Sequence, residues 1–309
     1  PLYSSAASDV YKRQDHNQLV METLRRVAVR HGFVCLLHEK PFSGVNGSGK
    51  HNNWSLVTDD GANLLDPGNT PHENMVFLVF LCSVIRAVDK YAKLLRAAVA
   101  TAGNEHRLGA NEAPPAIVSV FLGDQLTGIF EQLAAGGPRS SKNGGHLQLG
   151  VSTLPPLPKD STDRNRTSPF AFTGNKFEFR MVGSTQSTSG PMFVMNTIVA
   201  DVLAEVADTL EKNGDINAEV QKLLTRFAKE HRRVVFNGDN YTAEWVDEAA
   251  KRGLPNIAST VTSLQTITEP SHLDVFDRHC VLSKGELHAR AEILLEAYCL
   301  LYTSPSPRD

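Results

Sequence analysis

The stretch HEKPFSGVNGSGKHNNWS, residues 38–55, decides how this chain is interpreted. It contains three closely spaced glycines, Gly44, Gly47 and Gly49. Glycine permits backbone conformations that other residues avoid, and it lets a ligand approach the main chain closely. The stretch is therefore either a ligand-binding loop or a tight turn.

The residues after the glycines predict a strand with a polar face. Side chains alternate along a strand, so His51, Asn53 and Ser55 would share one face. Lys50, Asn52 and Trp54 would lie on the other face. An imidazole, an amide and a hydroxyl would then point into one cavity.

Residues 44–50 also spell G-x-x-x-x-G-K, the phosphate-binding P-loop pattern without its last letter. That letter should be a Ser or Thr that binds Mg²⁺, and here it is His51. A P-loop must also begin a helix, whereas the residues that follow favour a strand. The P-loop alternative depends on whether a helix begins at His51.

The stretch KFEFRM, residues 176–181, alternates aromatic and charged side chains. As a strand it buries both phenylalanines on one face and places Lys176, Glu178 and Arg180 on the other. Such a charged face is either solvated or the second half of a polar cavity. With His51, Glu178 would suit Mg²⁺ or Mn²⁺, since carboxylate oxygen favours these hard cations.

The composition excludes several classes of protein. The chain has 309 residues, of which 41% are hydrophobic, and a net charge of −3. The near-neutral charge argues against a non-specific nucleic-acid surface and a polybasic membrane surface. The longest apolar run, residues 75–85, is too short to cross a bilayer. The four cysteines lack paired spacing, which favours reduced thiols in a cytoplasmic protein.

Apolar periodicity predicts an α+β fold with a helical C-terminal region. A buried strand is expected over residues 33–38, leading into the glycines. Helices are expected over residues 18–30, 73–101, 126–134, 192–210, 217–230, 243–252, 272–280 and 284–296.

Four segments in order resemble the type III glutamine synthetase family: residues 38–55, RLGANEAPP at 107–115, NRTSPFAFTGNKFEFR at 165–180, and VVFNGDNYTAEWVDEAAKRGLPN at 234–256. The resemblance covers about residues 15–297. It implies part of a catalytic domain with a curved antiparallel active-site sheet and surrounding helices. It also implies an ATP-dependent ligase that forms L-glutamine from L-glutamate and ammonia through γ-glutamyl phosphate.

The resemblance assigns roles to residues of this chain by motif. It implies that His51 and Glu178 bind Mg²⁺ or Mn²⁺, that Asn46 and Gly47 contact glutamate, and that Asn53, Ser55 and Arg166 contact the nucleotide. It also implies that Arg107 and Arg180 bind the substrate carboxylates and the acyl phosphate. Glu112 would be a flap residue that accepts a proton from ammonium. Where the bacterial type I pattern has a further arginine, this chain has Ala171. The insertion at residues 231–256 is a type III trait to which no catalytic role is assigned.

The family implies a ring of identical subunits, a hexamer or a double-ring dodecamer, with active sites formed between neighbours. The alternative is a non-catalytic relative that keeps the fold for ring assembly or nitrogen sensing. No nucleic acid or membrane partner is expected.

Both ends of the chain resemble translated adapter sequence. We expect residues 1–14 and 298–309 to be non-native, since the helical pattern is lost at the second junction. The remainder divides into an active-site part, residues 15–190, and a helical part, residues 191–297. We therefore expect an internal fragment that lacks the remaining metal-binding glutamates and is inactive by itself.

Overall fold

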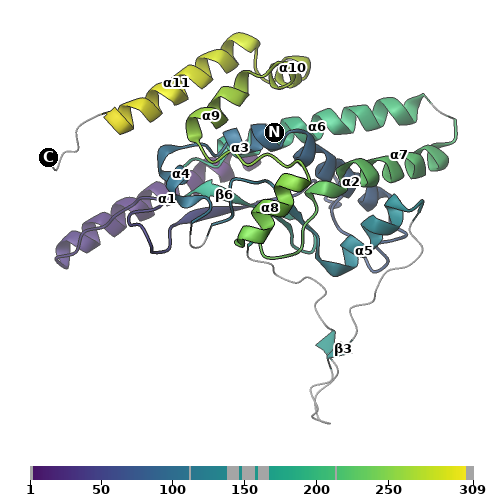
Figure 1. Ribbon diagram of the computed structural model, residues 1–309, viewed down its shortest axis with the longest axis horizontal. Coiled ribbons are helices and arrows are strands. Elements are labelled where there is room, and N and C mark those ends of the chain that lie inside the picture. Colours follow the sequence, from purple (N-terminus) through teal and green to yellow (C-terminus); the bar gives the residue numbers. More distant parts are fainter. Residues whose placement is uncertain are drawn as a thin grey trace.

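The structure, a computed structural model, describes residues 3–110, 113–137, 146–147, 157–158, 167–212 and 214–303 (Figure 1). Its strands are β1 (Gly49–Trp54), β2 (Val120–Phe121), β3 (His146–Leu147), β4 (Leu157–Pro158), β5 (Phe170–Phe172) and β6 (Phe177–Gly183). Its helices are α1 (Tyr3–Arg30), α2 (Met75–Lys90), α3 (Ala92–Ala97), α4 (Ala102–Arg107), α5 (Gly123–Ala134), α6 (Ser189–Glu211), α7 (Ile216–His231), α8 (Ala243–Lys251), α9 (Thr260–Gln265), α10 (Pro270–Arg278) and α11 (Lys284–Thr303), with the 3₁₀ turns η1 (Arg232–Val234) and η2 (Thr266–Thr268).

A four-stranded sheet in the order β1-β6-β5-β2 fits the predicted α+β class. β6 pairs antiparallel with both β1 and β5, but β2 pairs parallel with β5. The expectation of a purely antiparallel sheet is therefore wrong at β2. The long connection through α5 returns the chain to the same end of the sheet, which permits a parallel pair. β3 and β4 form a separate antiparallel pair.

Aromatic side chains fill the face of the sheet that the helices cover. The Phe170 and Phe177 rings stack with centroids 4.7 Å apart. The ring centroids of Phe172 and of Phe77 in α2 are 5.9 Å apart. Trp54 donates a 2.9 Å hydrogen bond from Nε1 to Asn196 of α6. Phe177 and Phe179 both pack against Phe170, as predicted for one face of β6, and on the other face Glu178 is half-buried and Arg180 is buried.

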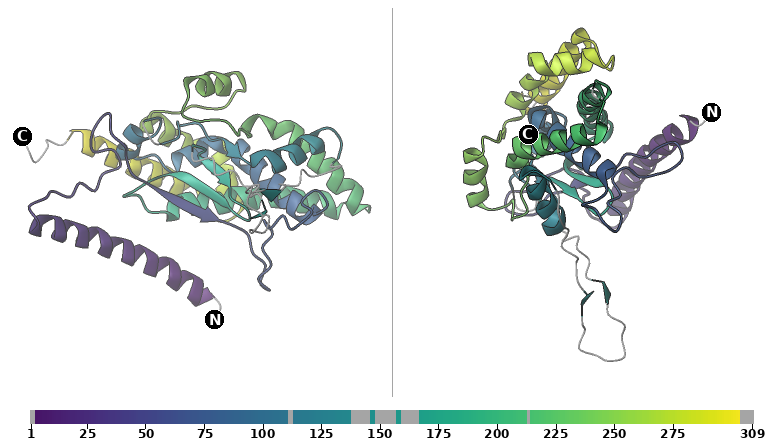
Figure 2. Two further views of the ribbon diagram at one scale, coloured as in Figure 1. Left: turned by 90° about the horizontal axis from the view of Figure 1, so that it is seen from below. Right: turned by 90° about the vertical axis from the view of Figure 1, so that its right-hand side faces the viewer.

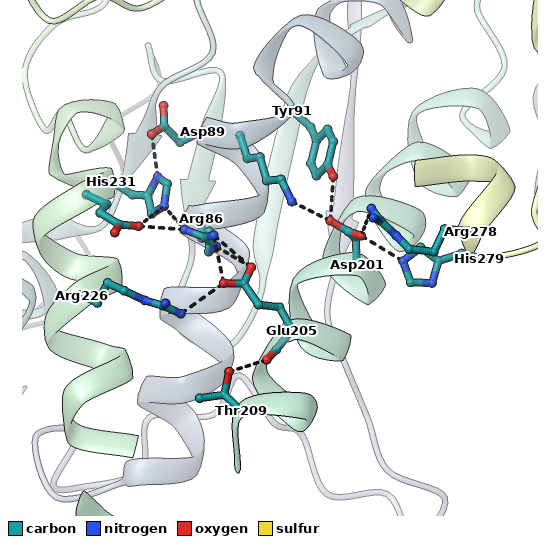
Figure 3. Close-up of polar contacts among 12 residues, drawn as sticks. Arg86, Asp89, Tyr91, Asp201, Glu205, Thr209, Arg226, His231, Arg278 and His279 are labelled. Carbon is teal, nitrogen blue, oxygen red and sulfur yellow. Dashed lines mark hydrogen bonds and ion pairs between the residues drawn. The ribbon is translucent and has the colours of Figure 1, made fainter. Parts of the chain in front are cut away.

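Ion pairs join the helices of the layer above the sheet (Figure 3). Arg86 of α2 lies 2.9 Å from Glu205 of α6 and 2.9 Å from Glu230 of α7. Its Nη1 is also 2.8 Å from Nε2 of His231, whose Nδ1 lies 2.7 Å from Asp89. These contacts fix α2, α6 and α7 relative to one another.

A second cluster surrounds Asp201 in the middle of α6 (Figure 3). Its carboxylate accepts hydrogen bonds from Lys90, Tyr91, Arg278 and His279. Within the described part of the chain, α6 is also the one helix long and apolar enough to span a bilayer. Half of that apolar window is buried, and a charged cluster in its centre fits a core helix of a folded domain.

Two predicted apolar elements are not buried. Residues 33–38 form no strand, and Phe33 and Val34 are 70% and 79% exposed. The helix predicted over residues 18–30 is present as part of α1, which stands apart from the body of the fold (Figure 2). Its apolar positions are exposed, because no described element packs against them.

Two helix boundaries also differ from the prediction. The single helix expected over residues 73–101 is broken at Tyr91, which leaves helical geometry and donates to Asp201. No glycine or proline marks this break, so it has no local signal in the sequence. At the other end, α11 continues to Thr303, whereas the helix predicted there stops at residue 296.

Candidate active site

The pairing of β1 with β6 brings the predicted metal ligands together. Nδ1 of His51 lies 2.9 Å from Oε1 of Glu178. The register shifts between Lys50 and Asn52, so His51 lies at an irregularity of the ladder. Such irregularities often redirect a side chain beside a functional site. The two halves of the predicted polar face therefore meet.

Arg180 holds the other oxygen of Glu178. Its Nε and Nη2 donate to Oε2 at 3.0 and 2.7 Å, and the Arg180 side chain is only 6% exposed. Burial raises the pKa of the Glu178 carboxyl, but the hydrogen bonds and charge of Arg180, together with His51, outweigh burial and hold that pKa below its ordinary value. Glu178 is therefore a carboxylate at neutral pH.

Asn53 and Ser55 continue the same face along the chain. Asn53 lies directly opposite Glu178 in the ladder and is exposed. Ser55 follows the end of β1, and its Oγ donates to Oδ1 of Asn63 at 2.6 Å. Because residues 49–54 form a strand, no helix begins at His51 and the P-loop alternative is wrong.

The glycine-rich loop closes on itself before β1 begins. The Ser48 N–H donates to the carbonyl oxygen of Glu39 at 2.8 Å, and Lys40 Nζ contacts the carbonyl of Val45. Gly44 has a φ of 80°, a conformation that favours glycine. The predicted glutamate contacts on this loop, Asn46 and Gly47, are exposed and half-buried respectively.

Arg107 lies beneath the start of β1 and is buried. Its Nη1 donates to Oδ1 of Asn104 at 3.2 Å, and its Nη2 donates to the carbonyl of Arg180 at 3.3 Å. A Cβ on Gly49 would lie 2.1 Å from Arg107 Nη2, so a larger residue there would have to displace the Arg107 guanidinium. The structure thus connects Arg107 to the backbone of Arg180, and its predicted substrate contact stays a prediction.

Glu112 and Arg166 lie outside the described residues. The two ends of the segment that carries Glu112 are nevertheless defined. The Gly109 N–H donates to the carbonyl of Pro114 at 2.9 Å, and Gly109 has a φ of 77°. The described residues on either side of Glu112 in the sequence are thus joined by a hydrogen bond, and the predicted role of Glu112 stays a prediction.

The sequence did not reveal the part played by Glu39. Its carboxylate is buried, accepts the Thr185 N–H at 2.9 Å and contacts the Thr185 hydroxyl. A Cβ on Gly183 or Gly103 would lie within 2.7 Å of this carboxylate. Glu39 thus joins the start of the glycine-rich loop to the end of β6. The only hint of this role in the sequence was an acidic residue next to the loop.

His51 and Glu178 fit a divalent cation as part of its coordination shell. One imidazole and one carboxylate held together are suitable ligands, but Mg²⁺ and Mn²⁺ prefer about six. Among the described residues, no group of three or more His, Cys, Asp or Glu side chains could hold a metal ion. Further ligands would have to come from elsewhere.

Comparison with known proteins finds matches to glutamine synthetases over most of the chain. The family described as "Glutamine synthetase, catalytic domain" matches residues 4–117, and "Glutamine synthetase C-terminal domain" matches residues 219–303. The "Type-3 glutamine synthetase" of Dictyostelium discoideum is 51% identical over 92% of this chain and 39% of its own length. The chain belongs to the glutamine synthetase family. The glutamine synthetase of Butyrivibrio fibrisolvens is 50% identical over 92% of this chain and 41% of its own length, and that of Bacteroides fragilis is 44% identical over 93% and 40%.

The likeness to glutamine synthetases extends over nearly the whole chain, which bears out the resemblance inferred from the four motifs. The chain spans about two fifths of the length of these three relatives. The matched region includes His51, Glu178 and Arg180, which the fold places in one connected network.

Proposed function

We propose that the protein is a glutamate–ammonia ligase that makes L-glutamine from L-glutamate, ammonia and ATP. The His51–Glu178–Arg180 network carries this proposal, because it holds a metal-ligand pair and a buried cation on one face of the sheet. The names of the three relatives support it. No described feature favours the non-catalytic alternative.

The reaction has two steps. A γ-carboxylate oxygen of glutamate attacks the terminal phosphorus of ATP, the bond to ADP breaks, and γ-glutamyl phosphate forms. Ammonia then attacks the carbonyl carbon, the bond to phosphate breaks, and the nitrogen loses a proton. The protein must therefore neutralise phosphate charge, hold the glutamate carboxylates, and exclude water from the acyl phosphate.

Arg180 is proposed to bind the acyl phosphate. Its two hydrogen bonds to Glu178 fix the plane of the guanidinium, and a fixed fork pairs well with carboxylate or phosphate. Arg107 supplies a second positive charge, and its guanidinium donates a hydrogen bond to the backbone carbonyl of Arg180.

The remaining contacts follow the arrangement of the loop and the strand. Asn46 and Gly47 are proposed to bind glutamate, and Asn53 and Ser55 to bind the nucleotide. His51 and Glu178 would hold Mg²⁺ or Mn²⁺, which when bound would offset the negative charge of the phosphates. Arg166 is proposed to meet the ATP phosphates.

Glu112 is proposed to accept the proton that ammonium gives up. A carboxylate on a short loop can attract ammonium and shield the intermediate from water. The Gly109 N–H donates to the Pro114 carbonyl, so the described residues that flank Glu112 in the sequence are joined to one another.

We further propose assembly into a ring of identical subunits in the cytoplasm. Exposed apolar side chains on α1 and at Phe33 and Val34 support a further packing partner, such as a neighbouring subunit. Light scattering of the full-length gene product checks this proposal: a monomer at micromolar concentration would contradict it.

One assay tests the proposed reaction. The full-length gene product is incubated with glutamate, ammonium, Mg²⁺ and ATP, and both glutamine and phosphate are measured. The proposal predicts one phosphate per glutamine and no glutamine when ATP is left out. Absence of glutamine formation with both Mg²⁺ and Mn²⁺ would refute it.

A further inference from the structure

A cavity of about 350 Å³ lies beside α4, and none of the residues that line it is assigned to glutamate, nucleotide or metal. Its walls come from residues 37–39, from the first turns of α4 and from Thr185 after β6. Among the described residues that line it, Glu39 supplies the one carboxylate. The cavity therefore combines a single acidic group with walls from three separate segments.

The Glu39 carboxylate is buried, and only one of its oxygens is occupied. Glu39 is 2% exposed, and its Oε1 accepts both the Thr185 N–H, at 2.9 Å, and the Thr185 hydroxyl. In the described part of the chain no group donates a hydrogen bond to Oε2. Lys50 attracts the carboxylate, but its ammonium donates to the Gln186 carbonyl at 2.7 Å. A buried carboxylate without a paired cation is costly, so Oε2 is a favourable position for a cationic ligand.

Gly103 of α4 leaves the space next to this oxygen open. A Cβ on Gly103 would lie 2.5 Å from Oε2 of Glu39 and 3.3 Å from Nε2 of His38. Glycine is a poor helix former, so its place inside α4 is not explained by helix propensity. Its lack of a side chain instead gives a ligand access to the carboxylate.

The tautomer of His38 narrows the class of ligand. The Lys40 N–H donates to Nδ1 of His38 at 3.0 Å, so a neutral ring carries its proton on Nε2. Nε2 is then a hydrogen-bond donor and not a metal ligand. Leu37 and Ala102 add apolar surface to the lining. A buried acceptor, a donor and an apolar wall fit an organic ammonium compound better than a divalent metal ion or an anion.

We propose that this cavity binds a small primary amine, whose ammonium group donates to Oε2 of Glu39 and whose carbon chain packs against Leu37 and Ala102. Two sources share this chemistry: a simple alkylamine, and an amino acid whose carboxylate also accepts from Nε2 of His38. The site goes beyond the proposed reaction and does not depend on it. Since α4 also carries Arg107, a bound amine would contact the helix of a proposed substrate residue.

Calorimetry of the full-length gene product tests the role of the charge. n-Pentylamine is titrated at neutral pH, where it is a cation like the lysine side chain, and 1-pentanol is the neutral probe of similar shape. Pentylamine should bind at least about tenfold more tightly, because only the amine forms a charge-assisted hydrogen bond. Glu39→Gln keeps an oxygen for Thr185 but removes the charge, and it should weaken pentylamine binding at least about tenfold. The exposed Glu73→Gln is its control and should leave the affinity unchanged.

A second variant tests the space and decides the question where Glu39→Gln gives no folded protein. Gly103→Ala places a methyl group between Oε2 and the ligand, so it should weaken pentylamine binding at least about tenfold. Alanine favours a helix, so α4 should be retained. Gly128→Ala in α5 is the matched control, because nothing lies within 4 Å of a Cβ at that position, and it should leave the affinity unchanged.

L-Norleucine identifies the source of the ammonium group, because it differs from n-pentylamine by one carboxylate. Only the binding that Glu39→Gln removes is compared. Norleucine that binds more tightly than pentylamine to the parent, but not to His38→Ala, supports the site with an amino acid as its ligand. Norleucine that binds more weakly than pentylamine to the parent supports the site with a simple amine.

Equal affinity of the parent for pentylamine and 1-pentanol would overturn the inference, and so would a parent that binds no pentylamine. Equal pentylamine affinity in Glu39→Gln and the parent, or equal weakening in Gly103→Ala and Gly128→Ala, would also overturn it. The titrations need no turnover. A parent that makes no glutamine would therefore refute the proposed ligase, while the binding measurements would still decide the amine site.

Discussion

Two charged clusters in this chain, one around Asp201 and one around Glu178, differ in how completely their groups are paired. Asp201 accepts hydrogen bonds from four side chains, two on each carboxylate oxygen, and its side chain is 6% exposed. Glu178 is held by Arg180 and His51, and the His51 side chain is 54% exposed. The acceptor positions of Asp201 are filled by groups of the protein, whereas the Glu178 cluster is exposed to solvent at His51.

From this difference we expect a structural role for the Asp201 cluster and propose a functional role for the Glu178 cluster. A buried carboxylate whose acceptor positions are filled has no capacity for a ligand, and its removal leaves buried partners uncompensated. A carboxylate paired with an exposed imidazole can exchange part of its hydrogen bonding for a metal or substrate. Substitutions in the first cluster should therefore change stability, and substitutions in the second should change activity.

The largest effect is expected for Asp201→Asn. The change removes the negative charge that Lys90 and Arg278 share, and we expect a loss of about 3 kcal/mol in unfolding free energy, because a buried carboxylate loses charge-assisted hydrogen bonds from four side chains, the buried Tyr91 among them. Thermal unfolding of the full-length gene product measures it. Asp208→Asn, at an exposed position nearer the end of the same helix, is the control and should have little effect. Equal melting temperatures for the two variants would show that the Asp201 cluster contributes nothing.

Glu178→Gln should lower activity strongly and stability only a little, the reverse of Asp201→Asn. The amide still accepts from Arg180, so stability should change less than in Asp201→Asn, but the charge toward a metal ion is lost. We expect glutamine synthesis to fall about a hundredfold at limiting Mn²⁺. The exposed Glu73→Gln serves as control. Full activity of Glu178→Gln at low metal concentration would contradict the ligand assignment.

Glu112→Gln should have a smaller effect, confined to the second step. ATP binding should stay near the parent value, while the ratio of glutamine to phosphate falls about tenfold because the acyl phosphate meets water. Both products are measured in the same reaction. A proportional fall of both would place Glu112 in the first step or in the fold.

The smallest effect concerns the pH dependence of stability. Burial raises the pKa of Asp201, but hydrogen bonds from Tyr91, Lys90 and His279 hold it well below the ordinary 3.8. A lowered pKa in the folded state means that Asp201 stabilises fully above its unfolded pKa, and that this contribution is lost as pH falls through the folded value. The melting-temperature gap between parent and Asp201→Asn should therefore be constant from pH 7 to about 5 and narrow below about pH 4. A gap that widens in acid would contradict this.

The sequence correctly predicted the positions of side chains where both residues of a contact belong to this chain. Alternation on residues 176–181 and after Gly49 correctly placed Glu178 on the same face as His51 and Asn53, because the period of a strand leaves little choice of face. The parallel pairing of β2 could not be foreseen, since a two-residue strand is too short to show a pattern.

Prediction failed where an apolar segment has no described element to pack against. The apolar residues at 33–38 predict a buried strand, yet Phe33 and Val34 are exposed. An apolar run indicates a preference for burial but not what provides it. Buried polar residues such as Glu39 and Asn240 were also missed, because their contacts join segments more than 70 residues apart in the sequence.

Electron paramagnetic resonance of Mn²⁺ bound to the full-length gene product tests the central claim most directly. If His51 is a ligand, the spectrum should show hyperfine coupling to an imidazole nitrogen. That coupling should disappear in His51→Ala and persist in His38→Ala, a control histidine that precedes the glycine-rich loop. A coupling that survives in His51→Ala would contradict the assignment of the β1–β6 face as a metal site.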